Sequence, residues 1–176
     1  MVMESIRTTR LHLVPATAEL VRAEIEAPDR FFQHLDVEPA ADGPSENLRD
    51  ALPLFYQQLR DAPEDVGWYC WYWILAEKRC LVGGGGFKGP PLSDGTVEIG
   101  YETRPGHRRC GYATEAVRAL AHWALRRQAV ARVIAETRAD NAPSIAVLGK
   151  LDFERSGTAS EPDLVRFEFS GQADPS

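Results

Sequence analysis

The eight residues Arg108–Glu115 constrain the fold of this 176-residue chain more than any other segment. They read Arg-Arg-Cys-Gly-Tyr-Ala-Thr-Glu and follow residues 96–103, a β-rich alternating stretch that Pro105 and Gly106 bring to an end. Residues 113–127 then have the periodicity of an amphipathic helix. The sequence therefore predicts a strand, a tight turn that carries two adjacent arginines, and a helix.

A turn of this kind predicts a phosphate site. The first N–H groups of a helix have no partner within the helix, and they lie at the positive end of its dipole. Gly111 lets a bulky anion approach the backbone, while Arg108 and Arg109 add positive charge. The anion that best fits this pattern is the pyrophosphate of a nucleotide-like cofactor.

Two common phosphate-binding loops are excluded because the sequence lacks residues that their motifs require. The glycine run at residues 83–86 lacks the Gly-Lys-Ser/Thr ending of a P-loop. It also leads into two prolines, whereas a dinucleotide fingerprint opens a helix. The pattern that does fit is Arg/Gln-x-x-Gly-x-Gly/Ala, which is filled by Arg108, Gly111 and Ala113.

Residues 96–153, which include a second strand at 132–137 and a short helix, resemble the acetyl-coenzyme A core of the GNAT superfamily of N-acetyltransferases. The similarity extends over residues 5–170 and is greatest to the ribosomal-protein N-terminal (alanine/serine) acetyltransferase branch. It implies an α/β (α+β) single-domain GNAT-like fold. Its mixed, mostly antiparallel central sheet is splayed between strands 4 and 5 and flanked by helices on both faces. One N-acetyltransferase domain over residues 1–176 is expected, with the acceptor side at about 15–65.

The resemblance also implies acetyl-coenzyme A as co-substrate. The backbones of Tyr101 and Thr103 are expected to pair with its pantetheine arm, and Asn141 to contact the same arm or to cap a helix. The residues expected to bind acetyl-coenzyme A are Tyr101, Thr103, Arg108, Arg109, Cys110, Gly111, Tyr112, Ala113, Thr114 and Asn141. No metal is expected, because the four His and three Cys form no ligand cluster.

The chain departs from the family at three positions. Arg109 and Asp152 stand where the family usually has glycine. Leu148 stands where many relatives have a tyrosine that protonates the departing thiolate. Ser144 matches a serine proposed as general acid in the nearest branch, although a hydroxyl at a helix start also satisfies a backbone N–H.

Two carboxylates are candidates for the base that deprotonates the acceptor amine. Glu98 lies on the strand expected to line the cleft, and Glu136 matches a glutamate with this role in some N-terminal acetyltransferases. A carboxylate partly buried in such a cleft has a raised pKa and can accept the ammonium proton. Either residue is also acceptable as a surface strand residue, so both readings stay open.

The leading hypothesis is an acyltransferase that moves an acetyl group from acetyl-coenzyme A to a primary amine by direct attack in a ternary complex. The acceptor is left open between a protein N-terminus and a small-molecule amine. The alternative is a non-catalytic acyl-coenzyme A sensor or regulatory module on the same fold, because the tyrosine acid is missing. A homodimer is expected by analogy with relatives alone.

Charge and hydropathy limit the kinds of partner that we expect for the protein. The net charge of −6 arises in residues 1–95, so nucleic acid is a poor partner. The longest apolar stretches are too short to span a bilayer, and no signal segment opens the chain. A cytoplasmic protein without a membrane partner is expected.

Further elements are predicted along the chain. Thr17 and Ser45 are expected to cap helices, with a loop at 28–45 between them and with Pro53 kinking or dividing the second helix. The aromatic-rich segment 68–86 predicts a hairpin, whose aromatic side chains belong to the core rather than to a ligand cage. Other expectations are a bulge or close backbone approach at the glycine run, solvated side chains for Arg118, Arg126 and Arg127, a strand at 164–169 and fraying at 171–176.

Overall fold

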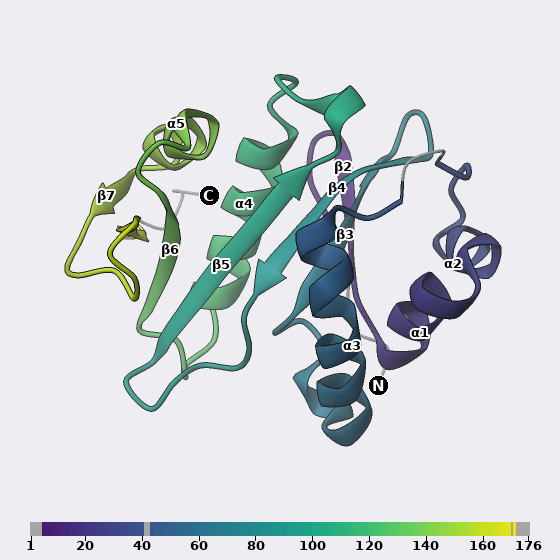
Figure 1. The fold of residues 1–176 in the computed structure, drawn as a ribbon, viewed down its shortest axis with the longest axis horizontal. Helices are drawn as coiled ribbons and strands as arrows, with labels where there is room; N and C mark the ends of the chain where they lie inside the picture. The colour runs from purple at the N-terminus through teal and green to yellow at the C-terminus, as the bar shows by residue number, and fades with distance from the viewer. Residues whose placement is uncertain (1–4, 41–42, 170, 172–176) are drawn as a thin grey trace.

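The computed structural model describes residues 5–40, 43–169 and 171 (Figure 1). The strands are β1 (Ile6–Arg7), β2 (Leu11–Pro15), β3 (Cys70–Leu75), β4 (Cys80–Phe87), β5 (Thr96–Thr103), β6 (Arg132–Arg138), β7 (Phe153–Arg155) and β8 (Leu164–Phe169). The helices are α1 (Ala18–Glu26), α2 (Pro28–Leu35), α3 (Glu46–Asp61), α4 (Tyr112–Leu125) and α5 (Ala142–Lys150), with short 3₁₀ turns η1 (Pro63–Asp65) and η2 (Pro105–His107).

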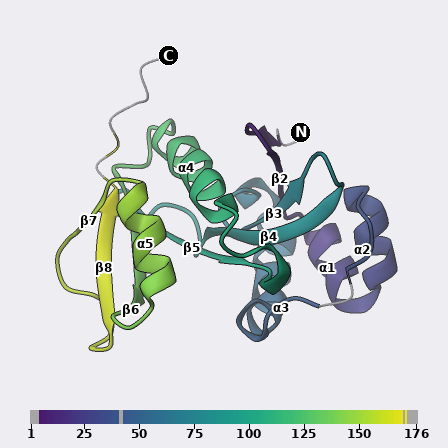
Figure 2. The same ribbon diagram turned by 90° about the horizontal axis from the view of Figure 1, so that it is seen from above.

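The eight strands form one sheet in the order β1-β2-β3-β4-β5-β6-β8-β7. Helices α4 and α5 cover one face, and α1, α2 and α3 cover the other (Figure 2). Neighbouring strands are antiparallel, apart from the parallel pair β5 and β6. This arrangement confirms the predicted fold class.

The sheet opens between β5 and β6. Their pairing runs from Thr96 opposite Arg132 to Glu98 opposite Ile134. Beyond this point β5 continues to Thr103 and β6 to Arg138, and the two strands diverge in Figure 1. The splay between strands 4 and 5 is therefore present, and these strands are β5 and β6 here because the short β1 precedes them.

The face under α4 holds the larger core. The predicted helix stripe is buried and consists of Val117, Leu120, Ala121 and Ala124. The indole of Trp123 packs against Trp71, with ring centroids 5.2 Å apart, and against Trp68 at 4.9 Å. The aromatic hairpin thus belongs to the core, as predicted. Arg127, by contrast, is not simply solvated, because its guanidinium lies 3.4 Å from the Trp123 ring centroid.

Both predicted helix caps on the opposite face are confirmed. The Thr17 hydroxyl accepts a hydrogen bond from the N–H of Leu20 at 3.2 Å, and the Ser45 hydroxyl accepts one from the N–H of Leu48 at 3.1 Å. Pro53 lies inside one helix, so a division into two helices is wrong. The buried side chains of Leu52 and Leu59, before and after the proline, pack α3 into the hydrophobic core on the α1, α2 and α3 face of the sheet.

The prediction of a loop over residues 28–45 is wrong for its first part, which forms α2. Pro28 occupies the first helical turn, where its missing N–H costs nothing and its fixed φ suits the helix. Phe31, Phe32 and Leu35 are buried, and Asp36 ends the helix in the left-handed conformation. Burial of this short apolar set outweighs the loop-like composition.

The short strands β1 and β7 were also not predicted, since two or three residues are too few to show alternation. The strand at 164–169 is confirmed as β8. The predicted fraying of 171–176 lies outside the described residues except for Gly171. Among the helices described, none has the length and apolar character needed to cross a membrane.

Candidate functional site

The turn between β5 and α4 has the geometry of an anion site. Arg109 and Gly111 both have left-handed backbones, with φ of 61° and 79°. Gly111 is the N-cap of α4, and no side chain within the described part of the protein caps this helix. The amides of the first turn, at Tyr112, Ala113 and Thr114, therefore lie at an uncapped helix N-terminus, where an anion is stabilised.

The arginines of the turn are exposed beside these amides. Nε of Arg108 donates to the carbonyl of Thr103 at 3.3 Å, which ties the turn to the end of β5. The Cys110 thiol is exposed and donates to the Arg108 carbonyl at 3.4 Å. Positive side chains and unpaired amides together match the two charges and many acceptor oxygens of a diphosphate.

A contact distant in sequence fixes this turn. Nη1 of Arg10 donates to the Cys110 carbonyl at 2.8 Å, and its Nε donates to Oε2 of Glu115 at 2.7 Å. Oε1 of Glu115 also accepts from the Thr8 hydroxyl at 2.6 Å and from the N–H of Arg10 at 2.7 Å. The Arg10 guanidinium lies 4.7 Å from the Tyr112 ring centroid.

This network sets the charge state of Glu115. Burial alone would raise the pKa of its carboxyl, but the hydrogen bonds from Thr8 and Arg10 outweigh burial, and the pKa is lowered. The sequence alone revealed neither the role of Arg10 nor that of Glu115. Nothing in a single sequence could link two residues 105 positions apart.

The open part of the sheet is bridged by a pair of hydroxyls. Tyr101 lies on β5 beyond its last pair with β6, and its hydroxyl is 3.0 Å from Oγ of Ser144 in the first turn of α5. Burial raises the pKa of Tyr101, while the bond to Ser144 opposes that rise. Oδ1 of Asn141 accepts from the N–H of Ser144 at 3.2 Å, so Asn141 is a helix cap.

The two candidate bases differ in their surroundings. Glu98 lies at the point where β5 and β6 part, and it forms an ion pair with Lys88. Oε1 of Glu136 accepts from the N–H of Ser160 at 3.0 Å and from Nε of Arg166 at 2.8 Å, and its Oε2 accepts from the Ser160 hydroxyl.

The pKa expected for a cleft carboxylate is wrong for Glu136. Burial favours a higher pKa, but the bonds from Ser160 and Arg166 outweigh it, and the pKa lies below its ordinary value. The side chain is only 1% exposed, so its partners hold it firmly. Glu98 is 20% exposed, and its partner Lys88 is largely in solvent.

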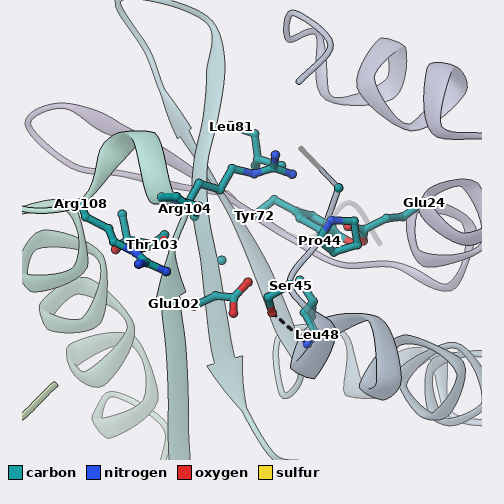
Figure 3. Close-up of a pocket in the computed structure, with 14 residues that line it drawn as sticks. Glu24, Pro44, Ser45, Leu48, Tyr72, Leu81, Glu102, Thr103, Arg104 and Arg108 are labelled. Carbon is teal, nitrogen blue, oxygen red and sulfur yellow. Dashed lines mark hydrogen bonds between the residues drawn. The ribbon is translucent and has the colours of Figure 1, made fainter. Parts of the chain in front are cut away.

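A cavity of about 150 Å³ lies beside the turn, between β3, β4, β5 and the start of α3 (Figure 3). Glu24 of α1 is 8% exposed, and Tyr72 donates a hydrogen bond of 2.6 Å to its Oε2. Burial raises the pKa of Glu24, against the effects of Tyr72 and Arg104. Glu102 lines the same cavity. The acceptor side was expected at about 15–65, but neither carboxylate was predicted from the sequence.

In the described part of the chain, no three His, Cys, Asp or Glu side chains are grouped so as to hold a metal ion.

Comparison with known proteins gives a consistent result. The family described as "Acetyltransferase (GNAT) domain" matches residues 10–154. The uncharacterized N-acetyltransferase YjdG of Bacillus subtilis (strain 168) is 33% identical over 151 residues, which cover 86% of this chain and 90% of that protein.

Solved structures share the fold at low sequence identity. An acetyltransferase from Agrobacterium tumefaciens str. C58 superposes with a TM-score of 0.66 at 19% identity, over 97% of this chain and 96% of the other. The ribosomal-protein-S5-alanine acetyltransferase of Vibrio fischeri gives 0.66 at 15% identity, over 94% and 96%. A ribosomal L7/L12 acetyltransferase, RimL, solved with coenzyme A gives 0.65 at 18%, over 94% and 97%.

The family match spans most of the chain and includes the uncapped turn and the open strands. The protein therefore belongs to the GNAT acetyltransferase family and is an acyltransferase that uses acetyl-coenzyme A.

Proposed function

We propose that the protein acetylates a primary amine by direct attack of that amine on acetyl-coenzyme A within a ternary complex. The observation that carries this proposal is the uncapped N-terminus of α4 beside the opening between β5 and β6. The co-substrate supplies an activated acetyl group as a thioester. The chain's own residues supply binding, orientation and proton transfer, which account for much of the rate gain in such reactions.

The turn and β5 are proposed to hold the co-substrate together. The amides of Arg109 to Thr114 bind the diphosphate, and the side chains of Arg108 and Arg109 add charge. The edge of β5 that faces β6 is not paired with β6 beyond Glu98, so the backbone of Tyr101 and the N–H of Thr103 can pair with the amide groups of an extended ligand, while the Thr103 carbonyl accepts from Arg108. An N–H group at this edge also polarises the acetyl carbonyl.

Glu98 is the better candidate for the general base. Its partner Lys88 is 65% exposed and can move away into water, whereas both oxygens of Glu136 accept hydrogen bonds, from Ser160 and from Arg166. A carboxylate with a lowered pKa is also a weaker base. We assign Glu136 to positioning of β6 against β8, with Arg166 as its partner.

The pair of hydroxyls at Tyr101 and Ser144 is proposed to protonate the leaving thiolate. Their oxygens are 3.0 Å apart and either can donate, so a proton given up by Ser144 can be replaced from Tyr101. A C–N bond forms, the C–S bond breaks, the amine proton passes to Glu98, and the sulfur takes a proton from the hydroxyl pair; Glu98 then releases its proton to water and the hydroxyl pair regains one from water, which balances the step. Leu148 is fully buried and supplies none.

The acceptor is either a protein N-terminus, as the names of the ribosomal-protein relatives suggest, or a small amine. A single domain over residues 1–176, a contact of Asn141 with the pantetheine arm, a homodimer and a cytoplasmic location stay predictions.

Thiol release with a panel of amines, together with mass spectrometry of the products, tests the function. Tight binding of acetyl-coenzyme A without thiol release for any amine would favour the sensor alternative.

The phosphate site is tested by Gly111→Ala. The added Cβ would lie 3.3 Å from Nη2 of Arg10, in a backbone that is strained for alanine. We expect calorimetry to show acetyl-coenzyme A binding weakened at least about tenfold. Gly149→Ala is the control, because its Cβ meets nothing within 4 Å. Normal binding by a folded Gly111→Ala variant would refute the assignment.

A further inference from the structure

One glycine of the run in β4 has no packing reason to be glycine. A Cβ would lie 2.6 Å from a backbone oxygen at both Gly83 and Gly85, and 1.7 Å from one at Gly86. At Gly84 its nearest neighbours would be the Trp71 carbonyl at 3.4 Å and a sulfur at 3.8 Å, which are ordinary contacts. The space that a side chain would fill at Gly84 is instead part of the cavity.

The strand register shows what this space separates. Gly84 pairs with Glu102 of β5 on one side and with Tyr72 of β3 on the other. The three residues form one row on the α1 and α3 face of the sheet, and Glu24 hydrogen-bonds to Tyr72 at the far end. Two strand spacings separate Glu102 from Tyr72, a span of roughly 10 Å. Glu102 lies on β5, which is also one side of the opening between β5 and β6.

The cavity is closed by the segment that leads into α3. Pro44, Ser45 and Leu48 line it opposite the sheet, and Leu81 adds an apolar side chain from β4. Figure 3 shows the Glu102 carboxylate turned toward Ser45. With its apolar walls and a carboxylate at each end, the cavity suits an aliphatic chain that carries a polar group.

The charges at the cavity select the sign of that group. The Glu102 side chain has no hydrogen bond or ion pair with any residue that the structure describes, and Glu24 has Tyr72 as its hydrogen-bond partner. Arg104 and Arg108 also line the cavity; Arg104 lies near Glu24, while Arg108 belongs to the phosphate turn and would face the diphosphate in the proposed complex. With Arg108 so engaged, two carboxylates stand against one guanidinium. A buried carboxylate without full compensation favours a cation.

We propose that this cavity binds the acceptor and receives the second, non-reacting ammonium group of a linear aliphatic diamine. Glu24 and Glu102 attract the two ammonium groups of the diamine, and Gly84 leaves room for the aliphatic chain between the two carboxylates. The reacting amino group reaches the edge of β5. The inference rests on the proposed function, because it names the acceptor class of the same site. Glu24 and Gly84 are specificity-determining residues in this scheme and do not touch the reacting atoms.

Three linear amines with seven carbons each test the proposal: diaminoheptane, heptylamine and aminoheptanoate. They differ only in ending in an ammonium, a methyl or a carboxylate group. We expect kcat/KM to be highest for the diamine, by about tenfold over heptylamine, and lowest for aminoheptanoate. Calorimetry with diaminoheptane in the presence of coenzyme A should show binding without turnover.

Variants locate the effect. Glu24→Gln keeps an acceptor oxygen for the Tyr72 hydroxyl, so the fold should persist. It should reduce the preference for the diamine over heptylamine to about one, and Glu102→Gln should weaken diamine binding by about tenfold. Gly84→Ala should raise KM for the diamine with KM for acetyl-coenzyme A unchanged. The matched controls are Glu26→Gln on the exposed side of α1 and Gly149→Ala, which should resemble wild type.

The outcomes separate this inference from the general function. Equal rates for the three amines, a preference for aminoheptanoate, or no acetylation of the diamine by a protein that binds acetyl-coenzyme A would each overturn the diamine site alone. Absence of acetyl-coenzyme A binding would overturn the proposed function as well.

Discussion

Substitution of Glu115 by Gln tests whether the contact between the start of β2 and the first turn of α4 holds the phosphate turn in place. Oε1 of Glu115 accepts two hydrogen bonds, from Thr8 and from the N–H of Arg10, and a glutamine oxygen can retain both. Oε2 accepts from Nε of Arg10 at 2.7 Å, and there the amide would present N–H groups to a donor.

The expected loss is one charge-assisted hydrogen bond. Such a bond contributes about 1.5–3 kcal/mol, and the Arg10 side chain is 43% exposed, so solvent reduces the value to about 1–2 kcal/mol. Because Arg10 also holds the Cys110 carbonyl, part of this loss should appear as a weaker site. A cost of about 1 kcal/mol corresponds to a roughly fivefold higher Kd for acetyl-coenzyme A.

Urea unfolding and calorimetry measure the two effects, and pH gives an independent check. The pKa of Glu115 is lowered in the folded protein, so its stabilisation is complete above the unfolded pKa and is lost as the pH falls through the folded value. The difference in unfolding free energy between wild type and Glu115→Gln should therefore be constant near neutral pH and shrink below about pH 4. Glu154→Gln, at an exposed position of β7, is the control.

A Glu115→Gln variant with wild-type stability and wild-type affinity would refute this reasoning. A stability loss that persists unchanged at low pH would show that the carboxylate charge is not its source.

Three further predictions concern stability and can be measured by chemical or thermal unfolding. Arg109→Gly should stabilise the protein by about 0.5–1 kcal/mol, since it relieves a left-handed backbone, and a loss of stability would contradict this. Trp73→Phe should lower the unfolding free energy by about 1 kcal/mol less than Trp71→Phe does. The reason is that Nε1 of Trp73 has no acceptor among the described residues, whereas Nε1 of Trp71 donates to a carbonyl at 2.9 Å. Equal losses for the two variants would argue against this. Gly86→Ala should prevent stable folding, and a cooperative unfolding transition like that of wild type would be the opposite result.

The features that depend on local backbone chemistry could be predicted from the sequence. Strand β5, the uncapped start of α4, the caps at Thr17 and Ser45, and the hairpin all follow from residues that are close together in the chain. Arg109 and Asp152, where the resemblance implied glycine, both adopt the left-handed backbone that glycine favours. The left-handed backbone is thus kept at these two positions without glycine, at a cost in backbone strain.

Features that depend on short segments or on burial were missed. Helix α2 has one buried set of three side chains and lies in a stretch whose composition indicates a loop. The raised pKa expected for Glu136 was wrong because the partners that lower it, Ser160 and Arg166, lie 24 and 30 residues away. A pKa depends on neighbours in space, which spacing along the chain does not reveal.

The glycine run shows most clearly where sequence reasoning stops. It predicted a bulge or a close backbone approach, and both occur, since the register shifts at Trp73 and three of the glycines have backbone oxygens too near for a Cβ. All four glycines look alike in the sequence. Only the tertiary structure shows that Gly84, which lines the cavity, has room for a Cβ, whereas a Cβ at each of the other three glycines would clash with a backbone oxygen. The same residue type therefore serves packing at three positions and, in our proposal, acceptor choice at the fourth, which is why the acceptor must be sought in tertiary geometry.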